Sequence, residues 1–405
     1  MLRGVTCLLT MVAVAQDPTP TLSLFARART NMVQNLKTQP NYVCLETIER
    51  SQKSSAKKRS TLLDVLRFEV AFVGSGELYA WPGSNRFDEK NLWEMVPPGG
   101  TIGTGSFAAH AYNLFVAGGP RFLPGVWTEI EGKQMAKYPF DVAEMVSAYR
   151  IRSNSDAWVA VPYRGFVLVD PAINQVVRMD IVADEIPIQL ELAEAHTIID
   201  FGNVKIGDNE YRLPTGAVDV LTRFTGLEQR NDSRFTGCRS YQTQSKLSFG
   251  DPPPDEAPVK AASKEVLLPP NADFYIDLVT RVDSATSQTG DLVEARLATP
   301  IKRNHEIVFD KKSVVEGRIV RLQRHTDWAE AEIQFTTIAD GEKSAPFTAV
   351  PLSENQPLSV SSAGPAGKPI FKPVPNRKGA GSILVRGDQL ILLKGMRSGW
   401  TTRTK

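Results

Sequence analysis

Apolar residues change their spacing near Pro40, and this change separates a predicted helix from a long series of predicted strands. From Pro20 to Pro40 they recur every three or four positions, which is the period of an amphipathic helix that Pro40 ends. After Pro40 the period becomes two, which predicts strands. The alternating segments are residues 42–50, 65–73, 77–81, 149–152, 157–161, 165–170, 176–182, 189–199 and 235–249, interrupted by a short helical stretch at 107–115.

A second alternating region follows a run of prolines. Residues 251–258 contain three consecutive prolines, which favour a stiff polyproline II conformation and mark the clearest boundary in the chain. A stretch rich in Pro, Gly and Ser at 359–381 is expected to be a loop or flexible arm. The alternating segments beyond the boundary are residues 274–278, 292–298, 314–322, 331–337, 383–385 and 389–393.

These patterns predict a mainly β protein. Many short strands in series favour a curved antiparallel half-barrel sheet, in an α+β first domain whose concave face carries one or two covering helices. A small all-β barrel or sandwich follows it. We therefore expect a signal peptide at 1–15, a curved-sheet domain at 20–250, a Pro-rich linker at 251–265 and a β-barrel domain at 266–405.

The first residues have the parts of a secretory signal peptide. Arg3 supplies the positive end, an apolar stretch follows, and Ala13 and Ala15 form a small-x-small cleavage site before Gln16. The apolar stretch is shorter than the roughly 20 residues that span a bilayer, and so is every later one. We expect an exported protein in the periplasm or the extracellular space, with no transmembrane segment in the mature chain. A buried N-terminal strand is the alternative.

Of the three cysteines, Cys7 lies in the expected signal peptide, which leaves Cys44 and Cys238. An even number of cysteines in an exported protein predicts a disulfide. This bridge would join the first strand of the curved sheet to its last and hold the two ends of the sheet together. Two buried free thiols are the alternative.

Composition and charge indicate a globular protein that does not bind nucleic acid. Hydrophobic residues make up 42% of the chain and charged residues 23%. The 47 basic and 45 acidic residues nearly balance, whereas a nucleic-acid-binding domain usually concentrates basic residues on one face.

Two hairpins of the first region resemble lipoprotein-carrier proteins of the outer-membrane lipoprotein-sorting type. Residues 163–171, followed by 176–179, carry a strand, an Asp-Pro turn and a strand with an apolar-Arg pair. Residues 199–204 and 212–214 look like the next hairpin. The resemblance covers roughly residues 20–250 and implies a half-barrel whose apolar concavity binds acyl chains.

The second region resembles the C-terminal β-barrel of TrbI-like conjugal-transfer proteins, through residues 290–301, 308–319 and 331–335. The flanks of the two cysteines, Asn41–Cys44 and Cys238–Tyr241, resemble those of secreted bacterial two-domain proteins. This last resemblance implies no function.

Motifs for catalysis, metals or cofactors are weak, so we expect no catalytic residue, no metal and no cofactor. His305-Glu306 begins like a zinc-binding helix motif, but Phe309 takes the place of the second His and the segment reads as a strand. The segment 103–106 suggests a phosphate loop but lacks its Lys, so a glycine-rich turn is favoured. A hydrolase would need Ser106 beside one of the four histidines.

Aromatic residues near the predicted helix–sheet contacts offer the main candidate site. They either form core or line an apolar ligand pocket between helix and sheet. The leading expectation is a non-enzymatic binding or scaffolding protein that holds an apolar or acylated ligand and docks on an envelope partner. The alternative is a purely structural envelope adaptor without a ligand. The candidate ligand-binding residues are Tyr79, Trp81, Phe107, Tyr112, Phe115 and Trp158.

Overall fold

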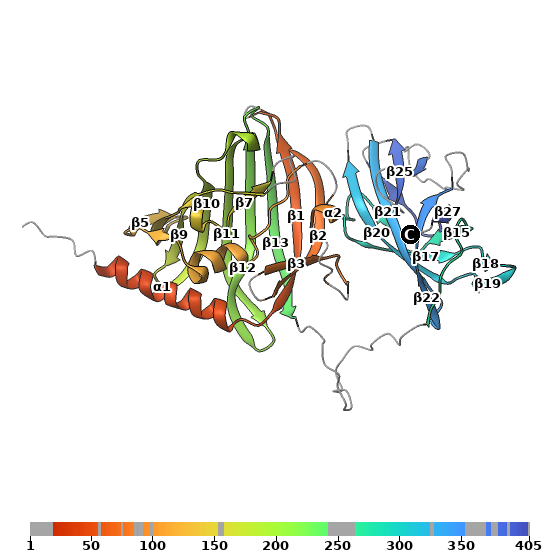
Figure 1. Cartoon of the computed structure of the whole chain (residues 1–405), viewed down its shortest axis with the longest axis horizontal. Coiled ribbons are helices and arrows are strands. Elements are labelled where there is room, and N and C mark those ends of the chain that lie inside the picture. Colours follow the sequence, from red (N-terminus) through yellow and green to blue (C-terminus); the bar gives the residue numbers. More distant parts are fainter. Residues whose placement is uncertain are drawn as a thin grey trace, which may run out of the picture.

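The computed structural model describes most of the chain in two β-rich parts (Figure 1). The expected signal peptide at 1–15 lies outside the described residues, as does 251–263 of the expected linker. The described residues are 19–55, 58–73, 76–84, 87, 92–96, 100–152, 158–241, 264–324, 328–352, 370–373, 380–386 and 389–403.

Eleven strands of the described chain form one antiparallel, strongly curved sheet, which confirms the predicted fold class. Their order is β3-β2-β1-β13-β12-β11-β10-β9-β6-β4, and β5 pairs with β6. The strands are β1 (Tyr42–Lys53), β2 (Thr61–Val73), β3 (Gly76–Ala80), β4 (Arg121–Phe122), β5 (Val126–Ile130), β6 (Lys133–Val142), β9 (Tyr163–Asp170), β10 (Gln175–Ala183), β11 (Leu192–Ile206), β12 (Asn209–Arg223) and β13 (Glu228–Ser240).

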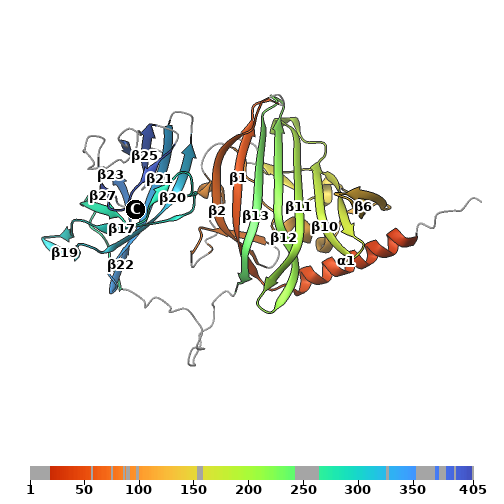
Figure 2. The same ribbon diagram turned by 180° about the vertical axis from the view of Figure 1, so that it is seen from behind.

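Helices cover one face of this sheet and leave its outer face open, as the two views show (Figures 1 and 2). Helix α1 (Thr19–Thr38) buries Leu24, Ala28, Met32 and Leu36, whose spacing of four puts them on one side of the helix. The shorter elements are α2 (Leu92–Met95), α3 (Ala109–Tyr112), the π-helical turn η1 (Asn113–Ala117), the turns η2 (Glu144–Val146) and η3 (Ile188–Leu190), and a ribbon of β7 (Arg150–Arg152) with β8 (Trp158–Ala160).

The disulfide between Cys44 and Cys238 is present. It does not join the two ends of the sheet, however, because β1 and β13 are hydrogen-bonded neighbours in its interior. The register shifts where the bridge lies, between Val43 and Leu45, and Gly237 opposite has a φ of 58°. This is a β-bulge that a glycine can adopt without strain.

A second sheet of ten described strands follows (Figure 1). Its order is β14-β22-β21-β20-β17-β15-β27-β23, with β25 paired to β21 and β24. The strands are β14 (Lys264–Glu265), β15 (Asp273–Leu278), β17 (Leu292–Leu297), β20 (Val314–Arg324), β21 (Trp328–Ala339), β22 (Lys343–Pro346), β23 (Thr348–Pro351), β24 (Ile370–Pro373), β25 (Ala380–Arg386) and β27 (Arg397–Arg403), beside the ribbons β16 (Val282–Asp283) with β26 (Ile391–Leu392) and β18 (Ile301–Arg303) with β19 (Glu306–Phe309).

The two sheets have separate apolar cores. Residues 370–373 form β24 and 380–386 form β25, so part of the segment 359–381, expected to be loop, is strand. Residues 353–369 and 374–379 of this region lie outside the described residues.

Main-chain hydrogen bonds connect the two sheets. The first half of β2 is an edge, because β3 pairs only with its second half. There Leu66 forms a parallel bridge with Thr289. The Arg67 N–H donates to the Thr289 carbonyl at 2.8 Å, and the Thr289 N–H donates to the Val65 carbonyl at 3.1 Å. Arg67 also pairs with Asp291 at 3.2 Å. The second part of the chain thus extends the open edge of the first sheet.

Candidate functional site

Five polar side chains lie in one row across the inner face of five neighbouring strands. Arg50 on β1 stands opposite Asp64 on β2 and opposite Asn231 on β13. Asp219 on β12 stands opposite Asn231 and opposite Thr197 on β11. Four of the five are buried, and Asp219 is partly exposed. We call these five residues the polar row. Buried polar groups are costly unless they are paired, so each one needs a partner.

One end of the polar row is a buried ion pair. The Arg50 Nε and Nη2 donate to the two oxygens of Asp64 at 2.7 and 2.6 Å. The side chains are 2% and 0% exposed. This two-bond geometry is the strong form of an Arg–carboxylate contact, and it neutralises both charges within the pair.

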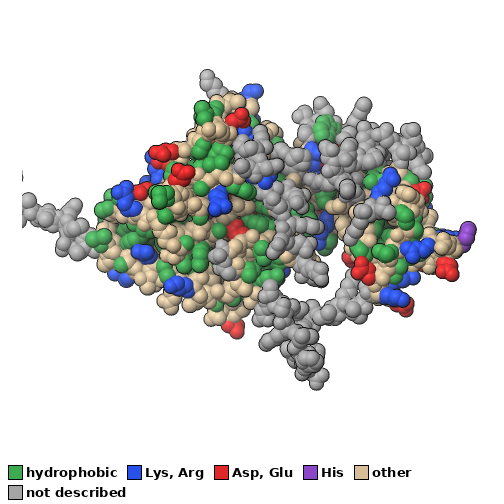
Figure 3. All heavy atoms as spheres, viewed as in Figure 1, with side chains coloured by type: hydrophobic (Ala, Val, Ile, Leu, Met, Phe, Trp, Pro, Cys, Tyr) green, Lys and Arg blue, Asp and Glu red, His purple; other side chains and the backbone are tan. Residues whose placement is uncertain are grey.

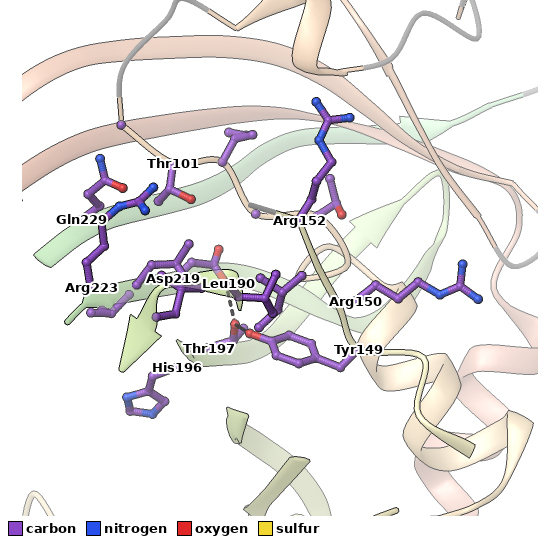
Figure 4. A pocket seen from close by; sticks show the side chains of 18 of the residues that line it. Thr101, Tyr149, Arg150, Arg152, Leu190, His196, Thr197, Asp219, Arg223 and Gln229 are labelled. Atoms are coloured by element: carbon purple, nitrogen blue, oxygen red, sulfur yellow. Dashed lines mark hydrogen bonds between the residues drawn. The ribbon is translucent and has the colours of Figure 1, made fainter. Parts of the chain in front are cut away.

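The other end of the row holds a carboxylate with hydroxyl partners. The Thr197 hydroxyl donates to Asp219 at 2.7 Å, and the Ser106 hydroxyl lies 3.4 Å from both carboxylate oxygens. Tyr149 reaches this group through Thr197, at 3.5 Å between the two hydroxyl oxygens (Figure 4). Burial raises the pKa of Asp219 to about 6, and the hydroxyl donors only partly oppose this shift.

Asn231, between these two groups, has no hydrogen-bond partner for either side-chain atom among the described residues. It is 1% exposed. Most buried amides in proteins are bonded, so a buried amide with neither donor nor acceptor satisfied indicates that water or a ligand completes the site.

A cavity of about 370 Å³ lies over the polar row. Arg50, Thr197 and Asp219 form part of its floor, beside Gln229. The volume falls in the range of small-molecule sites, roughly 300–1,000 Å³. The apolar residues that line it are Val96, Ile102, Ile151, Trp158, Leu190, Leu192, Val220 and Leu221. The cavity therefore combines apolar side chains with a polar floor. Arg150, Arg152, Arg223 and His196 also line it, whereas Asp64 and Asn231 of the polar row do not.

A glycine-rich loop covers the floor. A Cβ on Gly103 would lie 2.7 Å from the Asp219 carboxylate, so only glycine lets the backbone come this close. Gly105 has a φ of 97°, and a Cβ there would lie 2.9 Å from the His110 ring. The segment 103–106 was predicted to be a glycine-rich turn, and its first residues, Gly103 and Thr104, line the cavity; we call this segment the lid.

Glu77, on β3, anchors the end of this lid. Its carboxylate accepts hydrogen bonds from the N–H groups of Gly105, Ala108 and Ala109 at 2.7, 2.9 and 3.1 Å. The Tyr79 hydroxyl donates to it at 2.9 Å. These bonds satisfy N–H groups at the start of α3 that have no partner within the helix.

Further titratable groups are buried beneath the lid. Burial, followed by the charge of Glu77, raises the pKa of Glu46 to about 8. Burial lowers the pKa of His110, which keeps the ring neutral. One carboxylate oxygen of Glu46 has no hydrogen-bond partner among the described residues.

The six aromatic residues expected to bind a ligand do not surround one cavity. Tyr79, Phe107 and Phe115 are buried in the apolar core, and Trp81 and Tyr112 pack against it. Phe107 lies 5.0 Å from the Phe235 ring, centre to centre. At this level side chains fill the concavity.

Trp158 is the one of the six that lines the cavity over the polar row; it is 43% exposed. The polar row itself was not predicted. Part of its signal was present, because Arg50 falls in the inward phase of the strand that also buries Tyr42, Cys44 and Ile48.

Other candidates give no site in the described part of the chain. No group of three or more His, Cys, Asp or Glu residues there is arranged to hold a metal ion. Nor does any helix in this part have the length and apolar character needed to cross a membrane. His196 pairs with Asp180 at 3.1 Å, and His305 lies in the turn between β18 and β19. Positive and negative side chains are interspersed over the described surface in Figure 3.

Comparison with known proteins identifies no family. No family model and no curated protein matches the chain. Among solved structures, the chain is similar to the crystal structure of a DUF1329 family protein from Desulfovibrio piger, at 12% identity and a TM-score of 0.28. The match covers 56% of this chain and 95% of that chain. At these values it carries no argument about function, and it does not support either resemblance in the sequence analysis.

Proposed function

We propose that the half-barrel is a non-enzymatic binding module that holds an amphiphilic ligand in the cavity over the polar row. The apolar walls would take an alkyl or acyl chain, and the floor would take a polar end group. This ligand class excludes a purely apolar ligand, because a hydrocarbon would leave the polar groups of the floor without hydrogen-bond partners.

The mixed lining of the cavity carries this proposal, because Asp219 and Thr197 share it with eight apolar side chains. Between Arg50 and Asp219, the amide of Asn231 has no partner, whereas a wholly structural polar row would be expected to satisfy its own groups, as Arg50 and Asp64 do. The Ser106 hydroxyl contacts Asp219 rather than a histidine among the described residues, which favours binding over hydrolysis. The disulfide is consistent with an oxidising compartment, and we propose the periplasm or the extracellular space.

Native mass spectrometry of the protein purified without detergent tests the proposal. We expect a bound amphiphile, recoverable by solvent extraction, or saturable uptake of 1-octanol by the emptied protein. Leu221→Trp, which fills the cavity, should abolish both. Leu267→Trp, at a position 72% exposed on the second part, is the matched control and should leave them unchanged. A wild-type protein that neither carries an amphiphile nor takes up octanol would contradict the proposal.

A purely structural adaptor in the cell envelope is the second candidate. The main-chain contact between Arg67 and Thr289 favours it, because strand-like pairing makes a stiffer joint than a flexible linker. In-cell cross-linking that captures a defined envelope protein, together with an empty cavity in the experiment above, would favour the adaptor.

A further inference from the structure

We infer that the polar end of the ligand is a protonated amine, received by Asp219. The inference rests on the proposed function and specifies which end group the cavity selects. It follows from the place of Asp219 in the lining of the cavity and from the charges around it.

Asp219 has no cationic partner among the described residues: its contacts there are the hydroxyls of Thr197 and Ser106. The charge of Glu77 raises the pKa of Asp219, and the charge of Asp219 raises the pKa of Glu46. Both effects mean that these carboxylates disfavour a further negative charge nearby. The field at the floor is therefore negative. A positive end group would relieve it, and an anionic end group would add to it.

The cationic side chains that line the cavity do not form an ion pair with Asp219. Three of them have carboxylate partners of their own, in the pairs Arg50–Asp64, Arg223–Glu191 and His196–Asp180. The charge of His196 also lowers the pKa of Asp219, but burial outweighs it, so the pKa of Asp219 is raised overall. Arg152 lies over the Trp158 ring at 5.8 Å. Figure 4 shows Arg150 directed away from the Tyr149–Thr197–Asp219 group. His110, behind the lid, is kept neutral by burial.

The donor pattern of an ammonium group matches Asp219. An ammonium carries three N–H donors and no acceptor. The Asp219 carboxylate lines the cavity, accepts from the Thr197 hydroxyl and has further lone pairs. An ammonium in the cavity would supply donors to these lone pairs.

Protonation of Asp219 gives the inference a pH dependence. With a pKa of about 6 in the empty protein, the carboxyl is mostly ionised at pH 7.5 and mostly protonated at pH 5.0. An ammonium needs the ionised form. Its affinity should therefore fall about tenfold between these two pH values, whereas an uncharged alcohol should be little affected.

The test compares three probes with the same chain, octylammonium, 1-octanol and octanoate, by calorimetric titration of the full mature chain. We expect octylammonium to bind about tenfold or more tightly than octanol at pH 7.5, and octanoate most weakly. Asp219→Asn should remove the advantage of the ammonium and its pH dependence, and leave octanol binding intact. Asp208→Asn, in an exposed turn, is the control and should behave as wild type.

The outcomes separate the two levels of the argument. If octanol binds, and Leu221→Trp abolishes this, but octylammonium binds no better or Asp219→Asn keeps its advantage, the amine inference is wrong and the proposed function stands. If none of the three probes binds the wild-type protein, the proposed function is wrong and the inference falls with it. Thermal melting of each variant confirms that a loss of binding is not a loss of fold.

Discussion

A carboxylate kept for binding should destabilise the empty protein, and Asp219→Asn tests this directly. The ordinary pKa of the group is 3.8, and burial raises it to about 6 in the folded protein. A difference of one in pKa corresponds to about 1.4 kcal/mol. Ionised Asp219 should therefore cost the folded state about 3 kcal/mol.

The sign and the pH window follow from which state releases its proton first. Below pH 3.8 the carboxyl is protonated in both states and costs nothing. As the pH rises from 3.8 to about 6, the unfolded chain ionises while the folded protein holds its proton, so stability falls. Above about 6 the full cost is present and constant. An asparagine cannot ionise, and its amide oxygen can still accept from Thr197.

The assay is urea denaturation of wild type and Asp219→Asn, with the disulfide intact, at pH 4.0 and 8.0. We expect nearly equal free energies of unfolding at pH 4.0 and a variant more stable by about 2–3 kcal/mol at pH 8.0. Carboxyls that do not feel the charge of Asp219 titrate alike in both proteins and cancel in the difference. Glu46 does feel it, and removing that charge lowers the pKa of Glu46, which adds to the stability of the variant at pH 8.0. A variant that is no more stable at pH 8.0, or one stabilised equally at both pH values, would refute the reasoning.

Three further predictions concern the frame around the site. Arg50→Met should lose about 3–5 kcal/mol of stability, because it leaves the buried charge of Asp64 unpaired. Arg121→Met, in an exposed ion pair, should cost less than about 1 kcal/mol. Equal losses of the two variants in denaturation curves would contradict this. Cys238→Ser should lose up to about 5 kcal/mol, and reductant should do the same to wild type but nothing to the variant. Gly290→Ala places a Cβ 2.4 Å from the Arg67 carbonyl of β2, so hydrogen exchange of the amides at the contact between the sheets should become faster. Gly395→Ala, also at a positive φ but with nothing within 4 Å of its Cβ, is the control and should leave this exchange slow.

Much of the fold was predictable because the sheets alternate clearly. The helix at 19–38 and most strands of the first sheet appear where the apolar period indicates them. β6 was missed, since Pro139 breaks its pattern and proline rarely lies inside a sheet. In the structure Pro139 falls between the residues of β6 that pair with β4 and those that pair with β5, so its missing N–H removes no bond to either strand.

The candidate site was less predictable, for a reason that lies in the register. Polar residues in the inward phase of a strand, such as Arg50, can be read from the sequence. That Arg50 stands beside Asn231, and Asn231 beside Asp219, depends on how strands distant in the sequence are aligned. Alternation gives the face of each residue but not its neighbour on the next strand. For the aromatic residues the sequence could not choose between a core and a pocket, because a strand that buries tryptophan or phenylalanine has the same pattern in both.

The corrected position of the disulfide explains how this register is held. The chain leaves β1 toward β3, crosses to β4 at the far edge of the sheet, and returns strand by strand until β13 pairs with β1. A slip of one residue between β1 and β13 would turn Asn231 to the outer face and break the row between Arg50 and Asp219. The bridge from Cys44 to Cys238 lies across these two strands and forbids such a slip. In this arrangement the covalent bond does more than stabilise the fold: it fixes the alignment on which the site depends.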